Sequence, residues 1–140
     1  MFDDLIFGIN EGRPIIHLLL HVLVPAVVAW VFVLFTQGSK ADEYKRFIWV
    51  FFWMMASMVV DVDHLLAMPV YAPNRCSILF HPLHTAWPMV VYGVMLLWPL
   101  LLKQAGRTLQ QRDKLIGWLG TGLVIHMVLD GFDCLWLKGF

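Results

Sequence analysis

Charged residues and cysteines are both scarce in this sequence. Asp, Glu, Lys and Arg make up 14% of its 140 residues, against about 25% in soluble domains. The ten basic and ten acidic residues cancel, so no basic face is available and a nucleic-acid partner is not expected. Two cysteines, Cys76 and Cys134, are too few for a thiolate metal site, and neither lies in a C-x-x-C motif. We find no internal repeat, low-complexity linker or soluble domain.

Long apolar segments are abundant instead. Hydrophobic residues make up 60% of the chain, and its mean hydropathy is +0.73. Four segments, at about 14–36, 47–68, 82–102 and 115–137, have the length that a ~30 Å hydrocarbon core requires. Backbone groups in lipid must be paired internally, so each segment is expected to be a helix. The short connections predict an all-α, up-down four-helix bundle, with residues 1–140 forming a single transmembrane domain.

The distribution of Lys and Arg predicts how the bundle is oriented. Seven of the ten fall in the first and third connections: Lys40, Lys45, Arg46, Lys103, Arg107, Arg112 and Lys114. The other three, Arg13, Arg75 and Lys138, lie near the termini or in the second connection. Cytoplasmic loops carry an excess of Lys and Arg. The first and third connections are therefore expected in the cytoplasm, with both termini and the second connection outside.

Histidine and aspartate gather in the outer halves of the four segments. The histidines are His17, His21, His64, His81, His84 and His126, and the aspartates are Asp61, Asp63, Asp130 and Asp133. On an α-helix "HLLLH" places its two histidines on one face, and "HMVLDGFD" does the same for its histidine and two aspartates. In "DVDH" the first Asp and the His are three residues apart, as are the two histidines of "HPLH". Imidazole and carboxylate together suit Zn, Mn or Fe(II). Four carboxylates so close cannot all stay ionised without cations, so two divalent ions per chain are expected.

Other interpretations remain open from the residues alone. The histidines and aspartates could form a purely structural hydrogen-bonded network. A haem or electron-transfer bundle would use His pairs, although haem does not need Asp. Metal transport or sensing would need polar groups through both halves of the membrane, and "VVAWVFVLF" offers none. Arg75 fits a lipid-headgroup contact as well as a substrate contact, and Cys76 and Cys134 fit a disulfide or two free thiols.

The order of these motifs resembles the bacterial membrane-bound metal-dependent hydrolases. That family shows an early His, a D-[LIV]-D-H segment, an H-x-x-H-[ST] segment and a late H-x3-D. Here they correspond to His17, "DVDH", "HPLHT" and "HMVLD", and "NRCSILFHPLH" resembles a four-helix branch of the family. The resemblance implies metal-dependent hydrolysis of phosphoester-type bonds in the bacterial inner membrane. The chain departs from the pattern in having a second early histidine, His21.

We therefore expect a hydrolase that acts on a phospholipid or lipid-linked phosphate at the outer side of the membrane. The expected metal ligands, most simply for two Zn ions, are His17, His21, Asp61, His64, His81, His84, His126 and Asp130. A water activated by the metal would attack the phosphorus. Asp63 or Asp133 would take the proton from that water, and Arg75 would hold a phosphate oxygen. The depth of the site, roughly 5–15 Å below the surface at ~1.5 Å per helical residue, favours a lipid that enters sideways.

Overall fold

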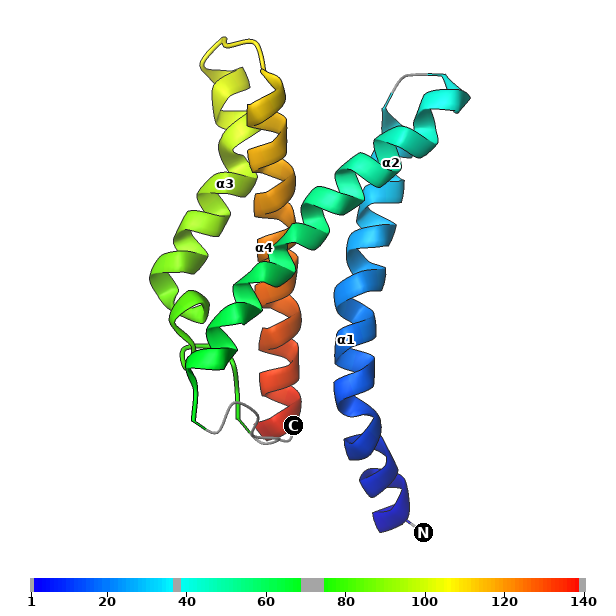
Figure 1. Ribbon diagram of the computed structural model, residues 1–140, viewed down its shortest axis with the longest axis vertical. Coiled ribbons are helices and arrows are strands. Elements are labelled where there is room, and N and C mark those ends of the chain that lie inside the picture. Colours follow the sequence, from blue (N-terminus) through cyan, green and yellow to red (C-terminus); the bar gives the residue numbers. More distant parts are fainter. Residues whose placement is uncertain (1, 37–38, 69–74, 139–140) are drawn as a thin grey trace.

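The computed structural model is all-helical over the residues it describes. It describes the backbone of residues 2–36, 39–68 and 75–138, and the side chains of residues 14–36, 39–68 and 75–136. The α-helices are α1 (Phe2–Phe35), α2 (Lys40–Met55), α3 (Ala86–Gln104) and α4 (Gln111–Lys138). Two 3-10 helices, η1 (Ala56–Leu66) and η2 (Pro82–His84), lie between α2 and α3 (Figure 1).

Four helical segments are long and apolar enough to cross a membrane: Pro14–Phe35, Lys40–Leu66, Ala86–Gln104 and Gln111–Trp136. Large apolar side chains point outward along them, including Leu18, Trp30 and Leu34 on α1 and Val90 and Leu100 on α3. Outward-facing apolar side chains suit a surface that meets lipid rather than water. The sequence-based prediction of an all-helical protein with four helices of spanning length is confirmed.

Helix α4 is the centre of the fold, since α1, α2, η1 and α3 all pack against it. Figure 1 shows α3 beside α4 and α2 crossing α4 at an angle. Two glycines of α4 allow these close approaches. A Cβ on Gly120 would collide with the backbone at Met95 and Leu96 of α3, and one on Gly122 with the backbone of Met54 in α2. Small residues at such crossings let helix backbones pack closely.

The second spanning segment is not α-helical throughout, which corrects the prediction for residues 47–68. It begins earlier, at Lys40, and changes after Met55 into the 3-10 helix η1. A 3-10 helix has 3.0 residues per turn, so residues three apart share a face. The buried residues of η1 are accordingly Ser57, Val60 and Asp63. The second aspartate of "DVDH" therefore points into the protein, where α-helical spacing would have turned it partly aside.

Other predicted boundaries also shift. Helix α1 extends back to Phe2, and α4 begins at Gln111 rather than near residue 115. His84 belongs to the short 3-10 turn η2, and His81 precedes it, because the α-helix starts only at Ala86. The side chains of Arg13 and Lys138, which contributed to the predicted orientation, lie outside the described residues.

A disulfide between Cys76 and Cys134 settles the question that the sequence left open about these thiols. Their Cα atoms are 4.9 Å apart, within the usual range for a disulfide. The bond ties the segment before η2 to the last turns of α4. It therefore holds together the end of the bundle at which the histidines and aspartates gather.

Candidate metal centre

Four side chains from three parts of the chain converge on one point. They are Asp61 of η1, His84 of η2, and His126 and Asp130 of α4. Nε2 of His126 lies 3.0 Å from Oδ1 of Asp61 and 3.6 Å from Oδ2 of Asp130. Nε2 of His84 lies 3.0 Å from Oδ2 of Asp130 and 3.6 Å from Oδ1 of Asp61. These four ligand atoms all lie within 4.8 Å of one another, close enough to hold one metal ion.

A second group adjoins the first and shares Asp130 with it. Nε2 of His17 and Nε2 of His21 lie 3.2 Å and 3.3 Å from Oδ1 of Asp130. Both histidines stand on one face of α1, four residues apart, as the sequence predicted. The other oxygen of Asp130 belongs to the first group. The two oxygens of the Asp130 carboxylate therefore belong to two different groups, each with imidazoles of its own.

Asp63 lies behind His84 rather than among the converging atoms. Its Oδ2 accepts a hydrogen bond from the backbone N–H of Leu83 at 2.7 Å and lies 3.3 Å from Nδ1 of His84. Because Nε2 of His84 faces Asp61 and Asp130, the proton of the ring is left for Nδ1, facing Asp63. A carboxylate that orients a ligating histidine in this way is common in metal sites. Asp63 is 4% exposed.

His64 and His81 occupy a neighbouring layer. Nδ1 of His64 lies 3.3 Å from Oδ1 of Asp63, and Nε2 of His64 lies 3.2 Å from Oγ of Ser77. The ring of His81 stacks on that of His64, with centroids 3.8 Å apart. Among the described residues, Asp63, His64 and His84 form a third group with ligand spacing, whereas His81 joins none. The structure thus brings seven of the eight predicted metal ligands into such groups and leaves His81 beside them.

The centre is closed on the inside and accessible on one side. His21, His126 and Asp130 are buried and His84 is 0% exposed. In contrast, the side chains of Asp61 and His17 are 37% and 31% exposed. Asp133, on the accessible side, has its Oδ1 4.0 Å from Nδ1 of His17. A small molecule or headgroup could therefore approach between η1 and the α1–α4 contact.

Burial and charge at the centre together favour a positive charge there. Nε2 of His21 and Nε2 of His84 are buried, and they lie 3.3 Å and 3.0 Å from carboxylate oxygens of Asp130. Burial lowers the pKa of His84, but hydrogen bonding to Asp130 and Asp61 and the charge of Asp130 outweigh it and raise that pKa to about 10. The carboxylates therefore favour positive charge at this point. A metal ion held by the same atoms would balance the charge of these carboxylates.

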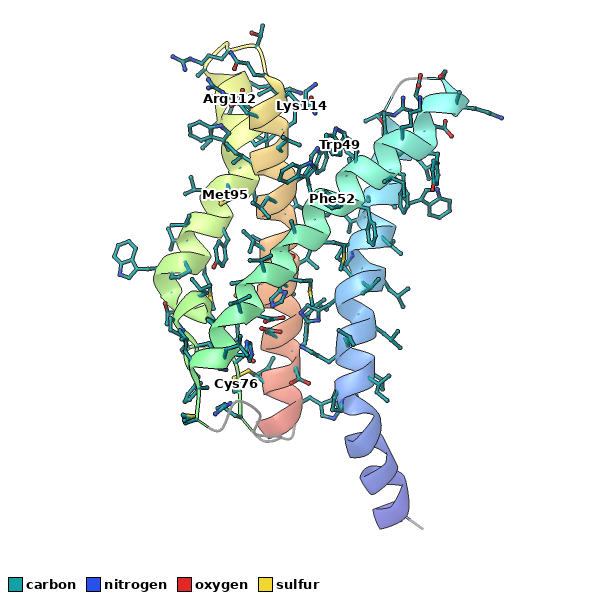
Figure 2. All side chains as sticks on the ribbon, viewed as in Figure 1. Trp49, Phe52, Cys76, Met95, Arg112 and Lys114 are labelled. Atoms are coloured by element: carbon teal, nitrogen blue, oxygen red, sulfur yellow. A yellow bond between two sulfur atoms is a disulfide. The ribbon has the colours of Figure 1, made fainter. Side chains whose placement is uncertain are left out.

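Arg75 lies in the same region of the fold, next to the disulfide. Its guanidinium carbon sits 4.8 Å from the ring centroid of Phe80. Burial lowers the pKa of His81 most, and the charges of His64, His84 and, least, Arg75 lower it further. Figure 2 shows Cys76, the neighbour of Arg75, at the end of the bundle opposite Arg112 and Lys114. The predicted substrate contact is thus at the same end as the metal ligands.

Sequence reasoning missed three supporting contacts. The hydroxyl of Ser77 contacts Nε2 of His64, and the backbone N–H of Leu83 donates to Asp63. The hydroxyl of Tyr92 donates to the carbonyl of Leu83 at 3.0 Å. Tyr92 thereby fixes the η2 turn that carries His84. Nothing in the local sequence signals these contacts, because each joins residues from different elements.

Comparison with known proteins gives a family but no activity. No curated protein and no solved structure matches this chain. One family matches residues 12–137, which includes every histidine and aspartate of the centre. The chain therefore belongs to the family described as "Family of unknown function (DUF6122)".

Proposed function

We propose that this protein is an integral membrane, metal-dependent hydrolase that cleaves a phosphoester in a phospholipid or lipid-linked phosphate. The observation that carries the proposal is the sharing of Asp130 by two ligand groups, one with Asp61, His84 and His126 and the other with His17 and His21. Two-ion sites bridged by a carboxylate suit in-line displacement at phosphorus. The resemblance of "DVDH" and "HPLHT" to membrane-bound metal-dependent hydrolases points to the same chemistry.

The side chains have separate roles in this proposal. When bound, divalent ions, most simply two zinc ions, would polarise the phosphate and lower the pKa of a water. Asp133 is the better candidate for accepting the proton, since its side chain is 22% exposed and lies beside His17. Asp63 is less suited to that role because it is buried and contacts Leu83 and His84. Arg75 would hold a phosphate oxygen of the substrate.

The proposed site faces outward from a bacterial inner membrane. Successive helices would alternate in direction and both termini would lie outside the cytoplasm. The excess of Lys and Arg in the first and third connections supports this orientation. So does the disulfide between Cys76 and Cys134, since disulfides persist in oxidising compartments. A centre near the outer leaflet, with its accessible side between helices, favours a lipid substrate.

The geometry disfavours one of the alternatives. A haem would need an open plane between paired imidazoles, but the four converging atoms of Asp61, His84, His126 and Asp130 all lie within 4.8 Å of one another. Metal binding therefore fits these converging atoms better than a haem does.

The test is metal analysis combined with an unbiased lipid assay. The full chain, purified in neutral detergent, should contain about two divalent ions and release headgroups or phosphate from a mixture of bacterial lipids, detected by mass spectrometry. Asp61→Ala should lose metal and activity together, because a ligating carboxylate is removed. Asp42→Asn is the matched control, since the Asp42 side chain is exposed and accepts a hydrogen bond from Ser39 far from the centre.

The outcomes separate metal binding from hydrolysis. Full metal occupancy with no product from any phosphoester lipid would overturn the hydrolase and leave a binding or sensing protein. Wild-type protein that purifies without metal and gains no thermal stability from added Zn²⁺ or Mn²⁺ would overturn the metal centre itself. Equal metal loss in Asp42→Asn would show that the Asp61 effect is not local.

A further inference from the structure

A cavity lies at the other end of the bundle from the metal centre. It has a volume of about 660 Å³ and is bounded by α1, α2, α3 and α4. This size is typical of small-molecule and cofactor sites, which are about 300–1,000 Å³. Its walls are mainly apolar and aromatic, with Phe32, Trp53, Trp118 and Leu100 among them. In Figure 2, Lys114 lies at the end of the bundle opposite Cys76, and Lys114 also lines the cavity.

The cavity carries basic groups without acidic ones. Arg46, Lys103 and Lys114 line it, and no Asp or Glu is among the described lining residues. Two acidic side chains at this end, Asp42 and Asp113, take part in hydrogen bonds of their own. Asp42 accepts a hydrogen bond from Ser39, and Asp113 accepts from the indole of Trp98 and the backbone of Gln110. The three cations therefore make an electropositive mouth on an apolar cavity.

Hydrogen-bond donors at this cavity are also left unpaired. Nε and Nη2 of Arg46 and Nε1 of Trp53 are buried and have no partner among the described residues. An uncompensated guanidinium within a spanning segment is costly. Arginine forks match the oxygens of phosphate. A bound phosphate group would therefore offset the charge of Arg46 and supply the acceptors that it lacks.

We propose that this cavity binds one anionic phospholipid from the leaflet at the basic end of the bundle. The phosphate would lie against Arg46, within reach of Lys103 and Lys114, and an acyl chain would occupy the apolar part of the cavity. Clusters of Lys and Arg next to spanning helices are a recognised feature of anionic-lipid sites. Because the cavity has both apolar walls and cations, it suits an amphiphile better than a soluble anion. The site and the metal centre share no residues.

The experiment measures lipid binding to the full chain after delipidation in neutral detergent. Phosphatidylglycerol and phosphatidylcholine with identical acyl chains are titrated, and native mass spectrometry counts the bound lipids while thermal melting measures stabilisation. One phosphatidylglycerol should be retained in preference to phosphatidylcholine. Arg46→Gln should weaken this binding by about fivefold or more, a factor expected for each cation removed. The double variant Lys103→Gln with Lys114→Gln tests the same site at exposed positions, where misfolding is not a concern.

Arg112→Gln is the matched control, because Arg112 lies at the same end but lines a separate, smaller hollow. It should bind phosphatidylglycerol as the wild type does. Equal weakening in Arg112→Gln would overturn the proposal in favour of general surface charge. Equal binding of phosphatidylcholine would show that the cavity binds acyl chains without recognising the anionic headgroup. Equal stabilisation by inorganic phosphate would show that the site binds a free anion rather than a lipid. If the lipid-free protein is a dimer and the Arg46→Gln variant is a monomer, the occupant would instead be a second copy of the chain.

Discussion

Asp63 and His84 form a buried pair in which the carboxylate contacts the side of the imidazole that faces away from the other carboxylates. Oδ2 of Asp63 lies 3.3 Å from Nδ1 of His84, and Nε2 of the same ring lies 3.0 Å from Oδ2 of Asp130. The backbone N–H of Leu83 fixes Asp63 in this position. The pair orients Nε2 of His84 toward the atoms of Asp61 and Asp130. It also distinguishes Asp63 from Asp133, which the sequence presented as equal candidates for the general base.

Asp63→Asn should reduce metal affinity by about 10–100-fold, the usual effect of changing the partner of a ligating histidine. The amide can present its NH₂ to Nδ1 and disfavour the tautomer that leaves Nε2 free for metal. Competition with a zinc chelator measures this change. At saturating metal, activity should largely return. A rate that stays low at full occupancy would instead make Asp63 the base.

Asp133→Asn should show the converse behaviour. Because Asp133 lies outside the ligand groups and on the accessible side, metal content should be unchanged. If it accepts the proton, turnover should fall by roughly 10²–10⁴-fold. The two measurements are metal content by mass spectrometry and the initial rate on whichever lipid of the mixture yields product. Loss of metal in this variant would contradict the assignment.

The two ligand groups predict a divided metal stoichiometry. His21→Ala removes a ligand from the group on α1 only, so it should retain about one ion per chain. His126→Ala should also lose at least one ion, from the other group. Asp130→Ala should lose both, because its two oxygens serve both groups. Metal-to-protein ratios across the three variants check this, and equal ratios in all three would argue for a single ion.

The disulfide predicts a redox effect on the centre. It joins residues with a sequence separation of 58. In the chain-entropy model, a disulfide that closes a loop of this length stabilises the folded protein by about 4 kcal/mol. Cys76→Ser with Cys134→Ser should therefore melt at a lower temperature and bind metal more weakly. In intact cells, a membrane-impermeant maleimide should label the wild type only after an impermeant reductant is added from outside. Labelling exclusively from the cytoplasmic side would reverse the proposed orientation.

Close helix packing can be tested on α4 itself. Gly122→Ala places a methyl group against the backbone of Met54, and overpacking of this kind costs typically 1–3 kcal/mol. Gly131→Ala is the matched control on the same helix, since nothing lies within 4 Å of its added Cβ. Thermal melting in detergent should show a lower midpoint for the first variant and no loss for the second.

The helical content and the candidate site residues could be read from the sequence because both depend on local properties. Length and hydropathy are enough to indicate a spanning helix, since lipid leaves the backbone no alternative. Pairs such as His17 with His21, or His126 with Asp130, follow from the helical repeat alone. The error in "DVDH" arose from the same reasoning, because α-helical spacing was applied to a segment that forms a 3-10 helix.

The sequence by itself determined that four apolar helices carry histidine and aspartate near one end, since composition and periodicity are properties of each segment alone. Only the tertiary structure decided which of those side chains meet. Asp130 reaches both groups because α1 and η2 pack on α4 at the same level. Asp63 and Asp133 differ in role because one is buried against Leu83 and the other is not. Such differences depend on distances between elements far apart in the chain, which no local pattern encodes.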